Sequence, residues 1–250
     1  MARRTLVGLA VAVTVVAAAW WIGMRESVVS AQGPRANCTA LPSNAELQGW
    51  LVEAAETGTY GEVGGLFGGT RMWAAVVNRD GELCGYITST EDPTQVWPGS
   101  QAIAKAKAYT ANAFSLDDFA LSTARLYTFT QPGHSLWSLG QSNLFNSHLL
   151  VAPGGSGDRN AIAGGLIFFG GGVPLYAGGK IVGGLGISGD TSCADHEIAK
   201  RVRDLAGMNP AGGSTADDID YEAGWFTHPL CINTFKNGMA LGDETEAAPY

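Results

Sequence analysis

The chain has 250 residues, of which 46% are hydrophobic and 15% charged, and it carries 35 glycines and a net charge of −8. The hydrophobic content supports a globular domain with a sizeable core and excludes a disordered chain. The negative charge, with no cluster of lysine or arginine beyond the N-terminus, argues against nucleic acid as a partner.

The first 31 residues have the pattern of an export signal or of a membrane anchor. Arg3 and Arg4 precede an uncharged apolar run, residues 6–24, and Ala31 ends a small-residue cleavage motif. This run is long for a signal peptide and just long enough to span a bilayer, so both alternatives stay open. In either case we expect the rest of the chain to lie outside the cytoplasm, in the periplasm or the extracellular space.

All four cysteines lie beyond this segment, in the part expected to be exported. An even number of cysteines in an oxidising compartment predicts two disulfides, and none of the four has the spacing of a zinc site. We expect the pairs Cys38–Cys231, which would join the two ends of the exported part, and Cys84–Cys193, which would join a strand to a helix.

The first predicted element is a helix that opens at a capping box, Ser43 with Glu46, and ends at Gly58. Further elements follow in chain order: strands at 72–77 and 82–88, a helix at 100–114, a short helix at 115–127, strands at 166–169, 173–177 and 180–188, and a helix that ends near 206. This order predicts one α+β domain, residues 38–207, with an antiparallel sheet flanked by helices. A linker and tail, residues 208–250, should dock on it through a disulfide.

The helix predicted at 100–114 carries a lysine on its apolar face. Lys107 shares that face with Phe114, whereas Lys105 points away from it. An inward lysine must either extend its ammonium to solvent or meet an anion or acceptor inside. Two interpretations stay open: a lysine that reaches the surface, and a pocket in which Lys107 holds an anionic ligand.

Residues 184–189, GLGISG, match the GxGxxG pattern but lack the βαβ unit that a dinucleotide site requires, so we assign these glycines to close packing. No nucleophile elbow is present. Among the histidines, His196 is predicted on a solvated helix face and His228 in the tail. His134 and His148 lie in loops, and either could be the axial ligand of a haem iron or a loop residue without a metal.

Four blocks occur in order: VVNRDGELCGY, KAKAYTANAF, TQPGHSLWSLGQSN and FFGGGVPLYAGGKIVGGLGISGDTSCADHEIA. Together they resemble the GlcG/HbpS-like haem-binding family, which also includes the C-terminal domain of the PduO proteins, and the resemblance covers residues 47–206. It implies a profilin-like fold, homo-oligomers and, in several exported members, bound haem. It also implies a ligand pocket lined by Lys107, Phe114, Pro132, Gly172, Pro174, Ser188 and Gly189.

Three functional hypotheses follow. The leading one is a non-enzymatic, exported haem-binding protein for haem storage, sensing or delivery. The second is an enzyme or accessory subunit that binds a small carboxylate metabolite at Lys107. The third is a structural subunit that joins an exported redox partner through the apolar surface around Trp137.

Overall fold

The computed structural model describes residues 37–150 and 161–244. The export signal or anchor predicted at 1–31, with its cleavage site, lies outside the described residues. Within the described ranges, no helix combines the length and the apolar character needed to cross a bilayer.

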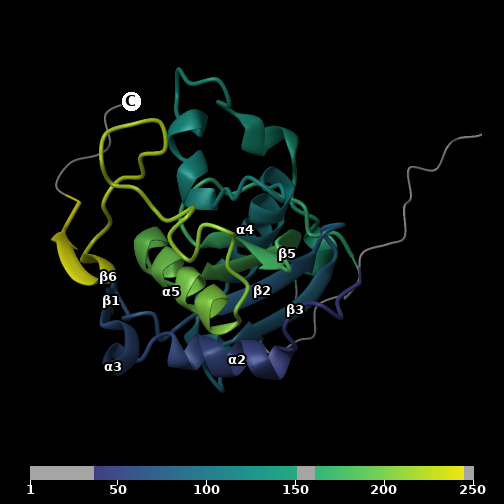
Figure 1. Ribbon diagram of the computed structural model, residues 1–250, viewed down its shortest axis with the longest axis horizontal. Coiled ribbons are helices and arrows are strands. Elements are labelled where there is room, and N and C mark those ends of the chain that lie inside the picture. Colours follow the sequence, from purple (N-terminus) through teal and green to yellow (C-terminus); the bar gives the residue numbers. More distant parts are fainter. Residues whose placement is uncertain (1–36, 151–160, 245–250) are drawn as a thin grey trace, which may run out of the picture. The chain divides into compact units, whose positions relative to one another are not determined.

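The central layer is a four-stranded antiparallel sheet in the order β3-β2-β5-β4 (Figure 1). Its strands are β2 (Trp73–Asn78), β3 (Leu83–Thr88), β4 (Gly172–Ala177) and β5 (Lys180–Ser188). Both predicted hairpins are confirmed, and they join through β2 and β5. The strand predicted at 166–169 is wrong, because this segment instead follows the helix α4, where the Ile167 N–H donates to Thr110 Oγ1 at 3.0 Å.

Helices cover both faces of this sheet (Figure 1). α4 (Ser100–Phe114) packs on one face, with residues 73, 75 and 77 of β2 turned toward it. α2 (Asn44–Glu53) and α5 (Ser192–Leu205) pack on the other, against residues 74 and 76. Because successive residues of a strand point to opposite faces, the two apolar cores lie on either side of one sheet. The prediction of an α+β domain with an antiparallel sheet flanked by helices is confirmed.

The capping box at α2 is formed as predicted: the Glu46 N–H donates to Ser43 Oγ, and the Ser43 N–H donates to a Glu46 carboxylate oxygen. The helix ends at Glu53 rather than at Gly58, and α3 (Thr57–Tyr60) is a separate turn. Most of the remaining short elements are 3₁₀ helices, namely η1 (Pro93–Gln95), η2 (Thr123–Leu126), η3 (Thr128–Thr130), η4 (Leu139–Ser142) and η5 (Ser147–Leu149). The helix predicted at 115–127 is wrong, because only the short η2 lies within that range.

The glycines of β5 allow α4 to lie close to the sheet. A Cβ atom on Gly184 would lie 2.2 Å from the Ala108 carbonyl oxygen, and one on Gly186 would lie 2.0 Å from that of Ala104. No side chain fits at either position. The GxGxxG pattern of this chain therefore serves the contact between a helix and a strand.

A second sheet, which the sequence pattern does not predict, pairs β1 (Glu62–Gly64) with β6 (Thr234–Gly242). It brings the C-terminal part of the chain back beside the start of the domain. We use "C-terminal segment" for residues 208–242, which follow α5 and include β6. This segment lies on the side of α5 that faces away from the central sheet, as the contacts given below show.

Both disulfides are present, but the predicted pairing is wrong. Cys38 is joined to Cys84, and Cys193 is joined to Cys231, with Cα–Cα distances of 5.5 and 5.9 Å. The reason is the path of the C-terminal segment, which crosses the start of α5 instead of returning to the first cysteine. The first bond therefore ties the chain before α2 to β3, and the second ties the C-terminal segment to α5.

Candidate functional site

Lys107 lies in the core, and its ammonium meets a carboxylate of the protein itself. Its Nζ is 2.7 Å from Asp195 Oδ2 and donates to the Ile187 carbonyl oxygen at 3.0 Å. Burial lowers the pKa of Lys107 and raises the pKa of Asp195 to about 6, and in each case the charge of the partner opposes the shift. The inward direction of Lys107 was predictable, whereas Asp195 lies 88 residues further along the chain, and no local pattern connects the two.

Several of the residues assigned to a ligand pocket pack around this ion pair. The Gly189 N–H donates to Asp195 Oδ1 at 3.1 Å. A Cβ atom on Gly172 would lie 2.7 Å from the Lys107 carbonyl oxygen. Pro174 and Ser188 are buried in β4 and β5, whereas Phe114 is half-buried at the end of α4 and Pro132 is exposed after η3. None of the seven lines the two cavities described below, so their ligand role stays a prediction.

Lys105 contacts a different part of the protein from Lys107, and it is buried as well. Its Nζ donates to the Leu149 carbonyl oxygen at 2.5 Å and lies 3.9 Å from the centroid of the Tyr86 ring. The chain around η5 covers this face of α4, which the helical pattern cannot reveal. Burial lowers the pKa of Lys105 to about 8. Among the described residues, no carboxylate pairs with it.

The outer face of α5 is buried as well, so the solvated position predicted for His196 is wrong. The C-terminal segment brings two acidic side chains over this face: Asp217 pairs with Arg203 at 2.6 Å, and Asp218 lies 3.4 Å from His196 Nε2. The Ile219 N–H donates to the same ring nitrogen at 3.1 Å. Because polar groups cover a polar face, the amphipathic pattern looks the same as it would on a solvated helix.

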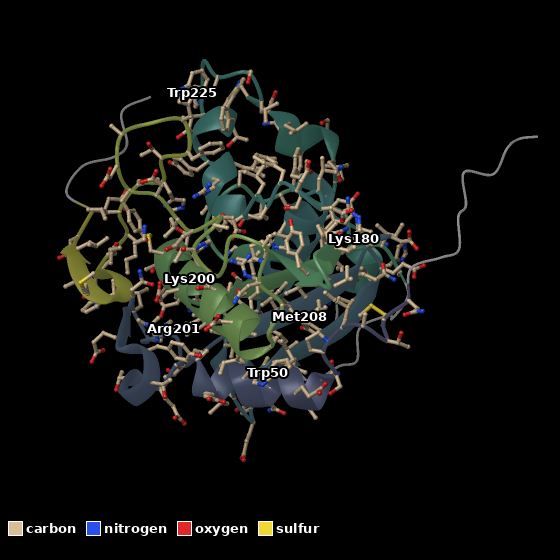
Figure 2. All side chains as sticks on the ribbon, in the orientation of Figure 1. Trp50, Lys180, Lys200, Arg201, Met208 and Trp225 are labelled. Carbon is tan, nitrogen blue, oxygen red and sulfur yellow. A yellow bond between two sulfur atoms is a disulfide. The ribbon has the colours of Figure 1, made fainter. Side chains whose placement is uncertain are left out.

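The C-terminal segment also forms one wall of a cavity of about 400 Å³, which we call the histidine cavity. Its other wall is the chain from Tyr127 to His134, and Tyr221 and His228 face it from the segment. Between Tyr221 and His228 in the C-terminal segment, Trp225 is largely exposed (Figure 2), and its ring centroid lies 6.4 Å from that of Phe129. The volume falls within the range of about 300–1,000 Å³ that is usual for small-molecule sites.

The two histidines of this cavity differ in what their ring nitrogens do. His228 is buried, and its Nδ1–H donates to the Pro229 carbonyl oxygen at 2.7 Å while Nε2 accepts from the Gly170 N–H at 3.3 Å. Burial lowers the pKa of His228 to about 4, so its ring is neutral at pH 7. His134 is exposed, and within the described ranges its ring has no hydrogen-bond partner. His134 is therefore the histidine whose nitrogens are available to a ligand.

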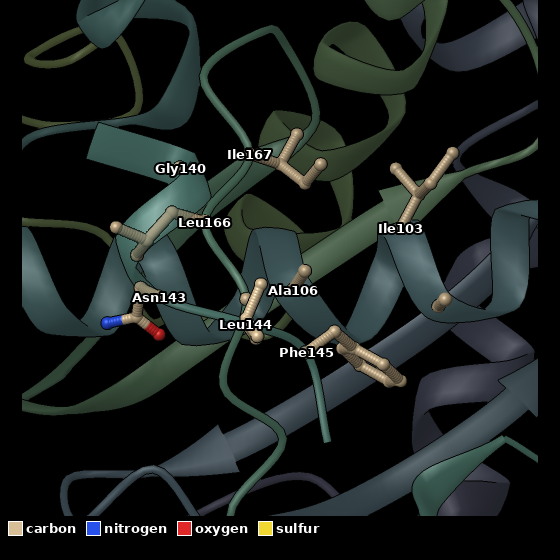
Figure 3. A pocket seen from close by; sticks show the side chains of 10 residues that line it. Ile103, Ala106, Gly140, Asn143, Leu144, Phe145, Leu166 and Ile167 are labelled. Atoms are coloured by element: carbon tan, nitrogen blue, oxygen red, sulfur yellow. The ribbon is translucent and has the colours of Figure 1, made fainter. Parts of the chain in front are cut away.

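A smaller cavity, of about 210 Å³, lies against α4 (Figure 3). Ile103 and Ala106 of α4 form one side of it, and Phe145 and Ile167 belong to the chain that crosses them. Its volume is below the usual range for small-molecule sites. His148 is exposed in η5 and lines neither cavity. Of the two predicted axial ligands, His134 thus lines one of these two cavities and His148 lines neither.

Comparison with known proteins gives one family match. Residues 66–204 match the model of a family described as "Haem degrading protein HbpS-like". Among proteins of curated function, none matches this chain.

Several solved structures are similar to this chain. A PduOC:haem complex has 24% sequence identity and a TM-score of 0.46, and the alignment covers 66% of this chain and 92% of that one. The protein ORFY of Klebsiella pneumoniae has 22% identity and a TM-score of 0.46, with 72% and 95% covered. HbpS has 21% identity and a TM-score of 0.44, with 72% and 96% covered.

Proposed function

Because this chain belongs to the HbpS-like family, whose model matches more than half of it, we propose that it binds haem in the histidine cavity, with His134 as the axial ligand. The description of the family names haem as the molecule on which its members act. The observation that carries the choice of site is the position of His134, which lines a cavity of about 400 Å³ and whose ring has no hydrogen-bond partner among the described residues.

The lining of the histidine cavity suits this ligand. An imidazole is a common axial ligand of haem iron, and His134 supplies one. Tyr127, Tyr221 and Leu230 add the aromatic and apolar surface that a porphyrin requires. The Tyr221 hydroxyl is buried without a hydrogen-bond partner among the described residues. A carboxylate of the haem would give this hydroxyl an acceptor, which removes the cost of burying it alone.

The two histidines of the cavity would have different roles in haem binding. His134 would hold the iron, which supplies redox chemistry when haem is bound. His228 would shape the wall of the cavity, where the Pro229 carbonyl and the Gly170 N–H hold its ring. This assignment leaves protein groups to bind and orient the haem, and it requires no catalytic step, in keeping with storage, sensing or delivery.

We also propose that the protein works outside the cytoplasm. Its two disulfides support this, because such bonds persist in oxidising compartments. A homo-oligomer and an exported redox partner stay predictions. The alternative of a carboxylate metabolite at Lys107 has no observation in its favour, because the ammonium is already paired with Asp195.

An absorbance titration with haemin tests the proposal on the purified chain with both disulfides intact. We expect a saturable shift of the Soret band, which His134→Ala weakens by at least tenfold in affinity. His148→Ala is the matched control, since His148 is equally exposed and lines neither cavity, and it should bind like the wild type. Unchanged binding by His134→Ala would refute the assigned ligand, and the absence of any shift would refute haem binding.

A further inference from the structure

A disulfide and a histidine form a buried cluster behind the histidine cavity. The sulfur atoms of Cys193 and Cys231 and one ring nitrogen of His228 all lie within 4.8 Å of one another, and all three residues are buried. In the oxidised protein the two sulfurs are bonded to each other. We infer that reduction of this disulfide creates a site for one thiophilic divalent cation such as Zn²⁺, held by Cys193, Cys231 and His228. The inference does not depend on haem binding.

The chemistry requires an external reductant. A dithiol transfers two electrons and two protons to the Cys193–Cys231 bond and itself becomes a disulfide, which leaves two thiols in the protein. When a zinc ion binds, both thiols lose their protons to solvent and ligate as thiolates. The cation changes no oxidation state, and the site disappears again when the disulfide re-forms.

The positions of the three side chains suit a tetrahedral ion. Zinc binds thiolate sulfur at about 2.3 Å and imidazole nitrogen at about 2.0–2.1 Å. The Cα atoms of the two cysteines are 5.9 Å apart, so that both sulfurs can reach one ion by rotation about their side-chain bonds. Two cysteines and one histidine leave the fourth position to water. His228 also lines the histidine cavity, so the cluster borders that cavity at this residue.

The first turn of α5 favours the thiolate that zinc requires. The Cys193 N–H donates to the Cys231 sulfur at 3.2 Å, and the Ser192 hydroxyl lies 3.4 Å from the same sulfur. Cys193 is the second residue of this helix, where the backbone N–H groups and the helix dipole stabilise negative charge.

One ring nitrogen of His228 makes the kind of hydrogen bond that metal-ligating histidines make. Such residues commonly donate one ring N–H to a carbonyl or carboxylate, which fixes the tautomer. Here Nδ1–H donates to the Pro229 carbonyl oxygen, so Nε2 keeps its electron pair. The competing contact of Nε2 is a long one, at 3.3 Å from the Gly170 nitrogen.

The test uses the full chain carrying Cys38→Ser and Cys84→Ser, so that only one pair of thiols can form. After reduction by a phosphine and its removal without oxygen, Zn²⁺ is titrated in competition with a coloured chelator, and Co²⁺ is added to a second sample. We expect one Zn²⁺ per chain and cobalt–thiolate charge-transfer bands, with binding at least about 100-fold weaker in the oxidised protein, because loss of outer partners alone costs about 10–100-fold.

Two substitutions in the same background assign the ligands. His228→Asn should weaken Zn²⁺ binding by at least about tenfold, whereas His148→Asn, at an exposed site away from the cluster, should leave it unchanged. Equal binding by the oxidised and reduced proteins, or by a Cys193→Ser variant, would overturn the inference. A reduced chain that loses its near-ultraviolet circular dichroism must regain it with one equivalent of Zn²⁺, and failure to do so would overturn the inference as well.

Discussion

Replacement of Lys107 by methionine should destabilise the fold far more than the same replacement of Lys105 in the same helix. Both lysines are buried, and methionine keeps most of the apolar stem of each. Lys107→Met leaves the Asp195 carboxylate buried, with only the N–H groups of Gly189 and Asp190 as donors. Lys105→Met removes a charge that no described carboxylate balances.

The size of the loss follows from the carboxylate that remains. Instead of staying charged, Asp195 can take up a proton. Since the ordinary pKa of the group is 3.8, protonation limits the total cost of burying this carboxyl to about 4 kcal/mol at pH 7 and about 2 kcal/mol at pH 5. Within that limit, removal of one partner of a buried ion pair typically costs about 3–5 kcal/mol, and part of the cost is already present in the wild type, where the pKa of Asp195 is raised to about 6. For Lys105→Met, relief of the buried charge offsets the lost contacts with Leu149 and Tyr86, so we expect a change within about 1 kcal/mol.

Urea unfolding of both variants at pH 7 and pH 5, with the disulfides intact, measures these differences. We expect Lys107→Met to lose most stability at pH 7, and Lys105→Met to stay near the wild type at both values. A Lys107→Met variant as stable as the wild type would refute the assigned ion pair and return this lysine to the role of a ligand-binding residue. Equal losses in the two variants would show that burial alone, without Asp195, sets the cost.

Two further predictions concern α4 and α2. Because the pKa of Lys105 in the folded protein is about 8, below its ordinary 10.5, the charged lysine opposes folding at neutral pH, and this opposition fades as the pH rises from 8 to 10.5. The full pKa shift of Lys105 equals about 3 kcal/mol of folding free energy. The contact of the charged ammonium with the Tyr86 ring is worth about 1 kcal/mol, and this contact is lost when the lysine becomes neutral. Urea unfolding should therefore show the wild type gaining about 2 kcal/mol on Lys105→Met over this interval, and a constant difference would contradict the buried charge. In Gly186→Ala the new Cβ would lie 2.0 Å from the Ala104 carbonyl oxygen, so thermal unfolding should show a loss of about 3 kcal/mol in stability. Gly49→Ala has open space around the new Cβ inside α2 and should gain about 1 kcal/mol in stability. Similar effects of the two substitutions would contradict the close contact between α4 and β5.

The sequence was sufficient for the elements whose signals are local. Gly178-Gly179 between two apolar runs predicts the β4–β5 hairpin, and Ser43 with Glu46 predicts the start of α2, because the residues that form each feature are neighbours in the chain. The same is true of α4, whose bounds match the prediction at both ends. The sequence also shows that Lys107 points inward, since this depends only on the helical period.

Features that depend on the path of the C-terminal segment could not be predicted. His196 has the sequence context of a solvated residue, and only the return of Asp218 over α5 makes it a buried one. The disulfide partner of Cys193 depends on the same path. One wall of the histidine cavity is the chain that holds His134, and the other is the C-terminal segment that holds His228. The sequence could therefore name His134 as a candidate, but it could not place His228 beside it.

The cover over α5 also has a consequence for biosynthesis. During synthesis the central sheet and its three helices are complete before the C-terminal segment leaves the ribosome, since the segment follows them in the chain. The face of α5 that the C-terminal segment later covers carries His196, Lys200 and Arg203, which water solvates well. An incomplete chain would therefore present a charged surface in place of the exposed apolar surface that makes most folding intermediates aggregate. The segment can therefore fold late without exposing the nascent protein to aggregation, and the bond from Cys193 to Cys231 then fixes the segment on α5.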